Sequence, residues 1–404
     1  MSRGYIAIPV FVLIAFSILF FSHYFVYFSL AYFFGISAPG PRDLLAGILF
    51  FLPASFIGSS ILAHWSDNLS SRLVYFASGL WLGVGLTLIV TFALTWAAWG
   101  MAKLLTRSPQ PAVYGWAAVA LAALYSGYGV WNAYHPRVRE LAVRIKDLPP
   151  AWRGKKVVQL SDVHLGYVLR TGFASRLVAM ANAENPDLVV ITGDLFDGGD
   201  GKLAEFVAPL NALRAPLGVY FVTGNHETYL GVERAYAALS ATRVRILADE
   251  MVTIDGLQLI GISYPERGHS LDLAQALAKL PGFTPALPSI LFYHGPTHIA
   301  QAKAAGINLQ LSGHAHQGQI FPLSVHFEVS LRKVLLRDAY RGRLHPVHLE
   351  RRRRLGPDHA NRQPSGNRGD QAGITRSAAP IAVTAQSGRT RGQSNSNPWD
   401  IRPR

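Results

Sequence analysis

Five short motifs contain most of the side chains in this sequence that could bind a metal ion. Imidazole nitrogens combined with carboxylate and amide oxygens suit Mn, Fe, Zn or Ni, whereas Ca and Mg prefer oxygen alone. The sequence has no cysteine, so thiolate ligands, disulfides and cysteine nucleophiles are excluded. The candidate residues are, in chain order, Asp162 and His164, Asp194 and Asp197, Asn225 and His226, His294, and His314 with His316.

Each motif directly follows a short apolar run of the kind that forms a buried strand. The runs are 157–160, 188–191, 219–222, 290–293 and 307–311, with a further run at 257–262. Helix-like stretches at 172–183, 205–213 and 231–239 lie between them, and this alternation predicts layered α/β structure. Ligands bind beyond the carboxyl ends of strands in such sheets, so we expect the motifs to meet at one edge.

The spacing within the motifs favours convergent side chains. Asp-x-His and His-x-His place two side chains on the same side of an extended segment. Glycine precedes Asp194, Asn225 and His314, which permits sharp turns and close backbone approach. One such motif alone is more often a turn or a surface accident, but five in order after strand-like runs are difficult to obtain by chance. His269 and His298 match no pattern and are expected to be incidental.

Residues 156–320 resemble the calcineurin-like metallophosphoesterase superfamily, and their flanks resemble its bacterial membrane-associated branch. The resemblance implies an α/β/β/α sandwich with two divalent metal ions, of which Mn, Fe, Zn and Ni remain open. Two departures are Ala315 and Gln317, where the family usually has Thr and Gly. The implied ligands are Asp162, His164 and His316 for one metal, Asn225, His294 and His314 for the other, and Asp194 as the bridge.

The same resemblance implies the reaction. His226 would protonate the leaving oxygen, and Asp197 would hold its imidazole and favour the protonated form. A metal-bridging hydroxide would be the nucleophile, because cations lower the pKa of bound water. The expected function is therefore hydrolysis of a phosphate ester or pyrophosphate, with lipid-linked and nucleotide-linked substrates both open. A non-catalytic membrane protein that retains the fold is the alternative from another class, and metal content would separate the two.

The first third of the chain predicts a membrane region at 1–134. No charged residue occurs between Arg3 and Arg42, Asp43 and Asp67, Arg72 and Lys103, or Arg107 and Arg137. Each gap exceeds the about 20 apolar residues that cross a bilayer, so we expect four helices, near 6–34, 44–63, 73–98 and 112–131. The first stretch is too long for a signal peptide. Six Lys and Arg residues lie near the spans on the side that holds the amino terminus and the catalytic domain, and three lie on the other side. The positive-inside rule therefore favours a cytoplasmic catalytic domain at a bacterial cell membrane.

Beyond the spans we expect a linker at 135–155, the catalytic domain at 156–325 and a tail at 326–404. The tail holds 16 Lys and Arg against 6 Asp and Glu, which is +10 of the net charge of +14. The remaining charge is modest, so a basic nuclease groove or other nucleic-acid binding is not expected. The tail's Arg, Ser, Gly and Pro composition predicts disorder. A frame shifted by one base over 343–372 permits strands and a glycine-rich turn that resemble the family's C-terminal block, so a frameshift is our second interpretation.

Overall fold

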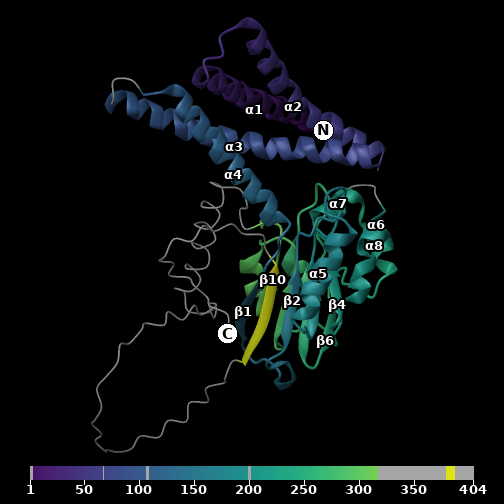
Figure 1. Cartoon of the computed structure of the whole chain (residues 1–404). Helices are drawn as coiled ribbons and strands as arrows, with labels where there is room; N and C mark the ends of the chain where they lie inside the picture. Colours follow the sequence, from purple (N-terminus) through teal and green to yellow (C-terminus); the bar gives the residue numbers. More distant parts are fainter. Residues whose placement is uncertain (1–2, 67, 106–108, 199–201, 317–378, 387–404) are drawn as a thin grey trace, which may run out of the picture. The chain divides into compact units, whose positions relative to one another are not determined.

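The computed structural model describes residues 3–66, 68–105, 109–198, 202–316 and 379–386. The chain forms two compact units, a helical one that ends at His135 and an α/β one that begins at Pro136 (Figure 1). Each unit is described by itself below.

The helical unit consists of four long apolar helices. All four are long and apolar enough to cross a membrane, and only 17% of each hydrophobic window is buried within protein. Most of the apolar surface therefore faces outward, as a lipid environment requires. Pro39 and Pro111 occupy first-turn positions, where the missing N–H costs no helical hydrogen bond. The helices are α1 (Arg3–Phe33), α2 (Pro39–Trp65), α3 (Leu69–Leu105) and α4 (Pro111–Ala133).

Polar side chains join these helices at buried positions. Ser59 and Ser78 approach to 2.6 Å between their hydroxyl oxygens, which connects α2 with α3. The Trp81 indole N–H donates to His23 Nε2 at 3.0 Å, while His23 Nδ1 donates to the Leu19 carbonyl at 2.8 Å. Hydrogen bonds of this kind hold helices together where lipid supplies no hydrophobic driving force. Both nitrogens of the buried His23 are thus satisfied in its neutral form.

Two sheets form the centre of the α/β unit. The first has the order β1-β10-β2-β3-β4-β5, and its strands from β10 to β5 are mutually parallel. The second has the order β6-β7-β8-β9, with β6 antiparallel to its neighbour. The strands are β1 (Val138–Ile145), β2 (Lys156–Leu160), β3 (Leu188–Thr192), β4 (Val219–Val222), β5 (Arg245–Ile246), β6 (Glu250–Ile254), β7 (Leu257–Gly261), β8 (Ser289–Phe292), β9 (Leu309–Leu311) and β10 (Ala379–Gln386).

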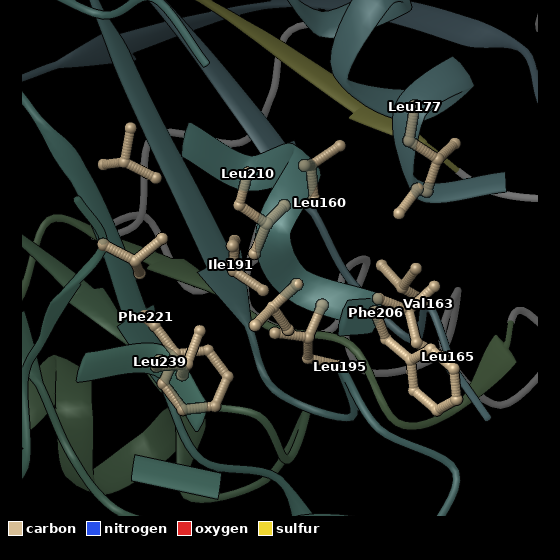
Figure 2. Packing of buried hydrophobic residues seen from close by; sticks show 14 of the residues in the cluster. Leu160, Val163, Leu165, Leu177, Ile191, Leu195, Phe206, Leu210, Phe221 and Leu239 are labelled. Atoms are coloured by element: carbon tan, nitrogen blue, oxygen red, sulfur yellow. The ribbon is translucent and has the colours of Figure 1, made fainter. Parts of the chain in front are cut away.

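Helices cover the outer faces of both sheets. Figure 2 shows Leu160, Ile191 and Phe221, from three strands of the first sheet, packed on side chains of the covering helices. Successive residues alternate between faces, so Val157, Leu188 and Val190 point instead into the layer between the two sheets. The helices are α5 (Thr171–Ala183), α6 (Leu203–Val207), η2 (Ala208–Ala212), α7 (Asn225–Leu230), α8 (Val232–Ser240), α9 (Leu273–Ala278) and α10 (Ile299–Ala304).

The second sheet completes the layers. Leu259, Ile290 and Phe292 face the first sheet, while Ile260 and Leu291 pack on α9 and α10 outside. The architecture is therefore four apolar helices followed by an α/β/β/α sandwich, as the sequence predicts. All six apolar runs expected to be strands are strands, with ends displaced by two residues at most.

Two segments differ from expectation. The predicted linker at 135–155 contains β1 and the short helix η1 (Pro150–Trp152). Trp152 anchors this segment, because its ring is fully buried and its N–H donates to the Ile254 carbonyl at 2.8 Å. The predicted tail at 326–404 includes β10, which lies between β1 and β2, so disorder is wrong for residues 379–386. The rest of the tail, and the segment of the proposed frameshift at 343–372, lies outside the described residues.

Candidate metal centre

The structure brings the seven predicted metal ligands to one edge of the sandwich. Four of them follow three neighbouring strands of the first sheet, β2, β3 and β4, and the other three follow β8 and β9 of the second. Because these strands are parallel within each sheet, their carboxyl ends lie at the same edge. The ligand-bearing segments are Asp162 with His164, Asp194, Asn225, His294, and His314 with His316.

One group of ligand atoms comes from both sheets. Asp162, His164, Asp194 and His316 each offer an atom, all within 4.8 Å of one another. His164 Nε2 lies 3.3 Å from His316 Nε2 and 3.9 Å from Asp194 Oδ2. His316 Nε2 lies 3.5 Å from Asp162 Oδ1. Two imidazoles and two carboxylates aimed at one point form a donor set that suits a transition-metal dication.

A second group shares Asp194 with the first. His294 Nε2 is 3.1 Å from Asp194 Oδ2 and 3.2 Å from Asn225 Oδ1. His314 Nδ1 lies 2.7 Å from the same amide oxygen. His294 Nδ1 donates to the Thr192 carbonyl at 2.7 Å, so Nε2 is the nitrogen that faces the group. Such a backbone bond fixes the tautomer and orientation of a metal-binding histidine.

The backbone at the ligands is unusual. Asp162, His164, Asp194, His314 and His316 all have positive φ, between 45° and 69°. Residues other than glycine rarely adopt this left-handed conformation, and such residues gather at functional sites. The extended geometry expected for Asp-x-His and His-x-His is therefore wrong. The side chains of each pair converge because both residues turn left-handed after the strand ends.

Two glycines allow the strand ends to approach each other. A Cβ at Gly193 would lie 2.7 Å from Gly224 N and from His294 Nδ1. A Cβ at Gly224 would overlap Asp194 Oδ1 and lie 2.6 Å from Asp194 N. Gly193 also has φ of 85°, which a side chain would oppose. Both positions therefore require glycine. The sequence already indicates this, because a glycine stands between each strand and the ligand that follows it.

Glu227 holds the backbone of two ligand-bearing turns, a position that none of the five motifs predicts. It is fully buried, and its two carboxylate oxygens accept four backbone N–H groups. Oε2 accepts from Asp194 at 2.9 Å and Gly224 at 2.7 Å, and Oε1 accepts from Leu195 at 2.9 Å and Phe196 at 3.1 Å. Burial raises the pKa of Glu227, and the donors oppose that rise. The signal was an acid three residues after Gly224, the pattern in which a side chain returns to the helix start.

His226 lies beside the first group. Its ring centroid is 4.5 Å from that of His164, and its backbone N–H donates to Asp194 Oδ1 at 2.9 Å. Nδ1 donates to the Asp197 backbone carbonyl at 3.2 Å, whereas the Asp197 carboxylate is 4.0 Å from it. Asp197 thus holds the ring chiefly through its backbone. With Nδ1 engaged, Nε2 is the nitrogen that can exchange a proton with a substrate.

Burial sets the charge of the histidines. Burial, and then the nearby His226, lowers the pKa of His164 to about 4. Burial also lowers the pKa of His314. Burial would lower the pKa of His294 too, but the hydrogen bond and charge of Asp194 raise it above the ordinary value. A neutral imidazole is the form that binds metal, so His164 and His314 are suited to be ligands. Asp194 is a buried carboxylate beside His294, and a cation bound at this point would compensate its negative charge.

The calcineurin-like phosphoesterase family matches residues 155–318. A bovine "Transmembrane protein with metallophosphoesterase domain" is 38% identical over 252 residues, 57% of this chain and 56% of that protein. An "Uncharacterized metallophosphoesterase" of Helicobacter pylori is 32% identical over 48% of this chain and 54% of its own length. A protein of Aquifex aeolicus with the same description is 30% identical over 50% of this chain and 77% of its own length.

These matches, the sandwich and the grouped ligands define the class of the protein. The chain belongs to the calcineurin-like phosphoesterase family. It carries four apolar helices ahead of the family domain, and it spans about half the length of the first two of these relatives. Of the two departures from the family pattern, Ala315 lies between His314 and His316, and Gln317 lies outside the described residues.

Proposed function

We propose that this chain is a membrane-anchored hydrolase of phosphate esters or pyrophosphates, which acts at a site for two divalent metal ions. The observation that carries the proposal is the sharing of Asp194 between two groups of ligand atoms. One metal would be held by Asp162, His164 and His316, the other by Asn225, His294 and His314, with Asp194 as the bridge. The donor set favours Mn, Fe, Zn or Ni.

The chain's own residues would divide the work at this site. The metal pair, when bound, would lower the pKa of a water molecule and clamp the phosphate oxygens for in-line displacement. His226 Nε2 would give a proton to the leaving oxygen, since Nδ1 is engaged by Asp197. Glu227 would keep the Asp194 backbone in place through the N–H groups that it accepts. His294 would keep one tautomer through the Thr192 carbonyl.

The test compares the full chain in detergent with its Asp194→Asn variant. We expect wild type to hydrolyse bis(p-nitrophenyl) phosphate with added Mn²⁺ and to contain about two metal equivalents. Asp194→Asn should lose activity and metal, because one bridging ligand serves both ions. Two metals in the variant would refute the ligand assignment. A wild-type protein without metal and without activity would favour the alternative, a non-catalytic membrane protein that retains the fold.

We further propose that the α/β unit is cytoplasmic, in a bacterial cell membrane. Four spans place both ends of the helical unit on one side, and the positive-inside rule favours that side, six basic residues against three. A reporter fused after Trp131 should be active only in the cytoplasm, and activity outside the membrane would refute the orientation. The compared residues are Arg3, Arg72, Arg137, Arg139, Arg144 and Lys146 against Arg42, Lys103 and Arg107.

A further inference from the structure

A segment from the second sheet reaches both halves of the candidate site. Residues 263–271 follow β7, and their start is anchored by two hydrogen bonds. Ser263 N–H donates to Asp249 Oδ1 at 3.0 Å, and Tyr264 N–H donates to Thr223 Oγ1 at 3.0 Å. The Tyr264 ring lies 5.7 Å from that of His294 and 5.9 Å from that of His314. The segment therefore begins against the second group of ligands.

Further along, the same segment reaches the proposed general acid. The Arg267 guanidinium carbon is 4.5 Å from the centroid of the Tyr229 ring, a cation–π contact. That ring is 5.6 Å from the His226 ring, and Tyr229 remains 52% exposed. We call Tyr229 and Arg267 the rim pair. It presents an aromatic surface next to the imidazole and a cation on that aromatic surface. Its two residues come from segments that follow strands of different sheets.

The rim pair is available to a ligand. Arg267 is exposed, and within the described residues it forms no ion pair. A guanidinium stacked on a ring by its face keeps its N–H edges free, and these edges match phosphate oxygens bidentately. The carboxylate of Asp197 faces His226 and His164 at 4.0 Å and 3.7 Å. An anion that approaches the rim pair would thus meet the Arg267 cation, with His226 and Asp197 beyond the Tyr229 ring.

We propose that the rim pair binds the leaving group, and that this leaving group carries a phosphate. The inference rests on the proposed function, in which His226 protonates the leaving oxygen. The group attached to that oxygen must lie beside His226, where the rim pair offers a ring in contact with the imidazole and a cation on that ring. The substrate is then a pyrophosphate diester. Water oxygen bonds to the attacked phosphorus, the bridging P–O bond breaks, and its electron pair leaves with the second phosphate, which takes the proton.

The same chemistry can come from a nucleotide or from a lipid, so the test uses both. The probes are ADP-ribose, CDP-diacylglycerol and bis(p-nitrophenyl) phosphate, whose leaving group has no phosphate. The variants of the full chain are Arg267→Gln, Arg267→Lys, and Arg243→Gln as the matched control. Arg243 is an exposed arginine just before β5, at the amino ends of the strands and so at the opposite edge of the sheet. Metal content is measured in every variant.

We expect Arg267→Gln to raise KM about tenfold for the two pyrophosphate diesters, the scale of one charge-assisted contact, with kcat little changed. KM for bis(p-nitrophenyl) phosphate should not change, Arg267→Lys should recover part of the loss, and Arg243→Gln should have no effect. Whichever of ADP-ribose and CDP-diacylglycerol is hydrolysed more efficiently shows whether the natural substrate is a nucleotide or a lipid.

Equal effects of Arg267→Gln on all three probes, or no effect, would overturn the inference alone. So would a wild-type enzyme that cleaves only bis(p-nitrophenyl) phosphate, and in that case the proposed function stands. Hydrolysis of none of the probes by a metal-loaded wild type would overturn the proposed function, and this inference with it.

Discussion

At the scale of single residues, the proposed function assigns proton supply and metal binding to different side chains. His226 contributes no atom to the two ligand groups that share Asp194, although its ring touches that of His164. We therefore predict that His226→Ala keeps its metals and slows turnover by roughly 10²–10⁴, the usual scale for a lost general acid. The loss should shrink for a p-nitrophenyl ester relative to a phenyl ester, because the better leaving group needs less protonation. An equal loss for both esters would remove the acid role.

Glu227 would act by holding the backbone of Asp194 and Gly224, and this role can be tested. Glu227→Gln keeps the size of the side chain but points an NH₂ group at two of the four backbone N–H donors. Each N–H left without an acceptor costs about 1–3 kcal/mol, so the melting temperature should fall. Metal affinity should fall too, because Asp194 and Gly224 lose a common anchor. A variant that binds metal like wild type at temperatures where it is folded would refute the positioning role.

The contrast between these two residues indicates what the sequence could predict at the site. The family resemblance implied that His226 lies beside the ligands, and its ring is 4.5 Å from that of His164. Glu227 was not assigned a role, because its function depends on N–H groups from two turns that are distant in sequence. The left-handed conformation of Asp162 and His164 was also missed, because alternation along a strand does not describe residues beyond its end. The residue types were enough to predict which side chains could bind a metal ion. The backbone conformation at those residues could not be predicted, because it depends on how the strand ends pack together in the folded protein.

At the scale of elements, the start of β2 is held by a carboxylate from the turn before β3. Asp187 accepts from Lys155 Nζ at 2.7 Å and from Lys156 N–H at 2.8 Å. Burial would raise the pKa of Asp187, but these donors lower it below the ordinary value. A carboxyl whose pKa is lowered by folding stabilises the native state at pH values above its pKa in the unfolded chain, which is about 3.9. That contribution disappears as the pH falls through the folded value.

We therefore predict that Asp187→Asn lowers the free energy of unfolding by about 1–3 kcal/mol near neutral pH. Below about pH 4 the difference from wild type should narrow, because wild type then loses the same charge. Thermal melts of the full chain in detergent at several pH values measure both effects. Asp255→Asn, an exposed acid in the turn between β6 and β7, is the matched control and should change little. A difference that stays constant down to pH 3 would contradict the charge-based explanation.

Element boundaries were predictable where one pattern dominated. The strands β2, β3, β4, β7, β8 and β9 are buried apolar runs. Each of the four long helices contains one uncharged stretch, but α2 and α3 extend past the charged residues that bound it. β1 and β6 were not predicted, because charged and apolar residues are mixed along each strand, as in Arg139, Glu140 and Leu141 of β1. β5 has only two residues, too few for any pattern. β1 is also stabilised by β10, more than 200 residues later, and such pairing leaves no local signal.

At the scale of the whole molecule, the C-terminal part decides whether the first sheet is complete. β10 pairs along its length with β1 and over four residues with β2, so both strands depend on a segment of the predicted tail. Deleting residues 379–404 would leave β1 with no sheet partner among the described strands. It would also expose one edge of β2, the strand that leads into Asp162 and His164.

We predict that this deletion lowers the melting temperature by on the order of 5 °C or more and reduces metal content, because β2 leads into the proposed ligands Asp162 and His164. A deletion that only removes residues 387–404 is the control and should leave both unchanged if β10 is sufficient. The frameshift interpretation makes a different prediction for the same place. A chain in which the frame is restored over 343–372 should then melt higher than the printed chain, since its own apolar strands would pair with the sheet. Independent copies of the gene that encode His326 to Arg404 without interruption, together with a loss of stability on deleting 379–404, would refute the frameshift and establish β10 as part of the native fold.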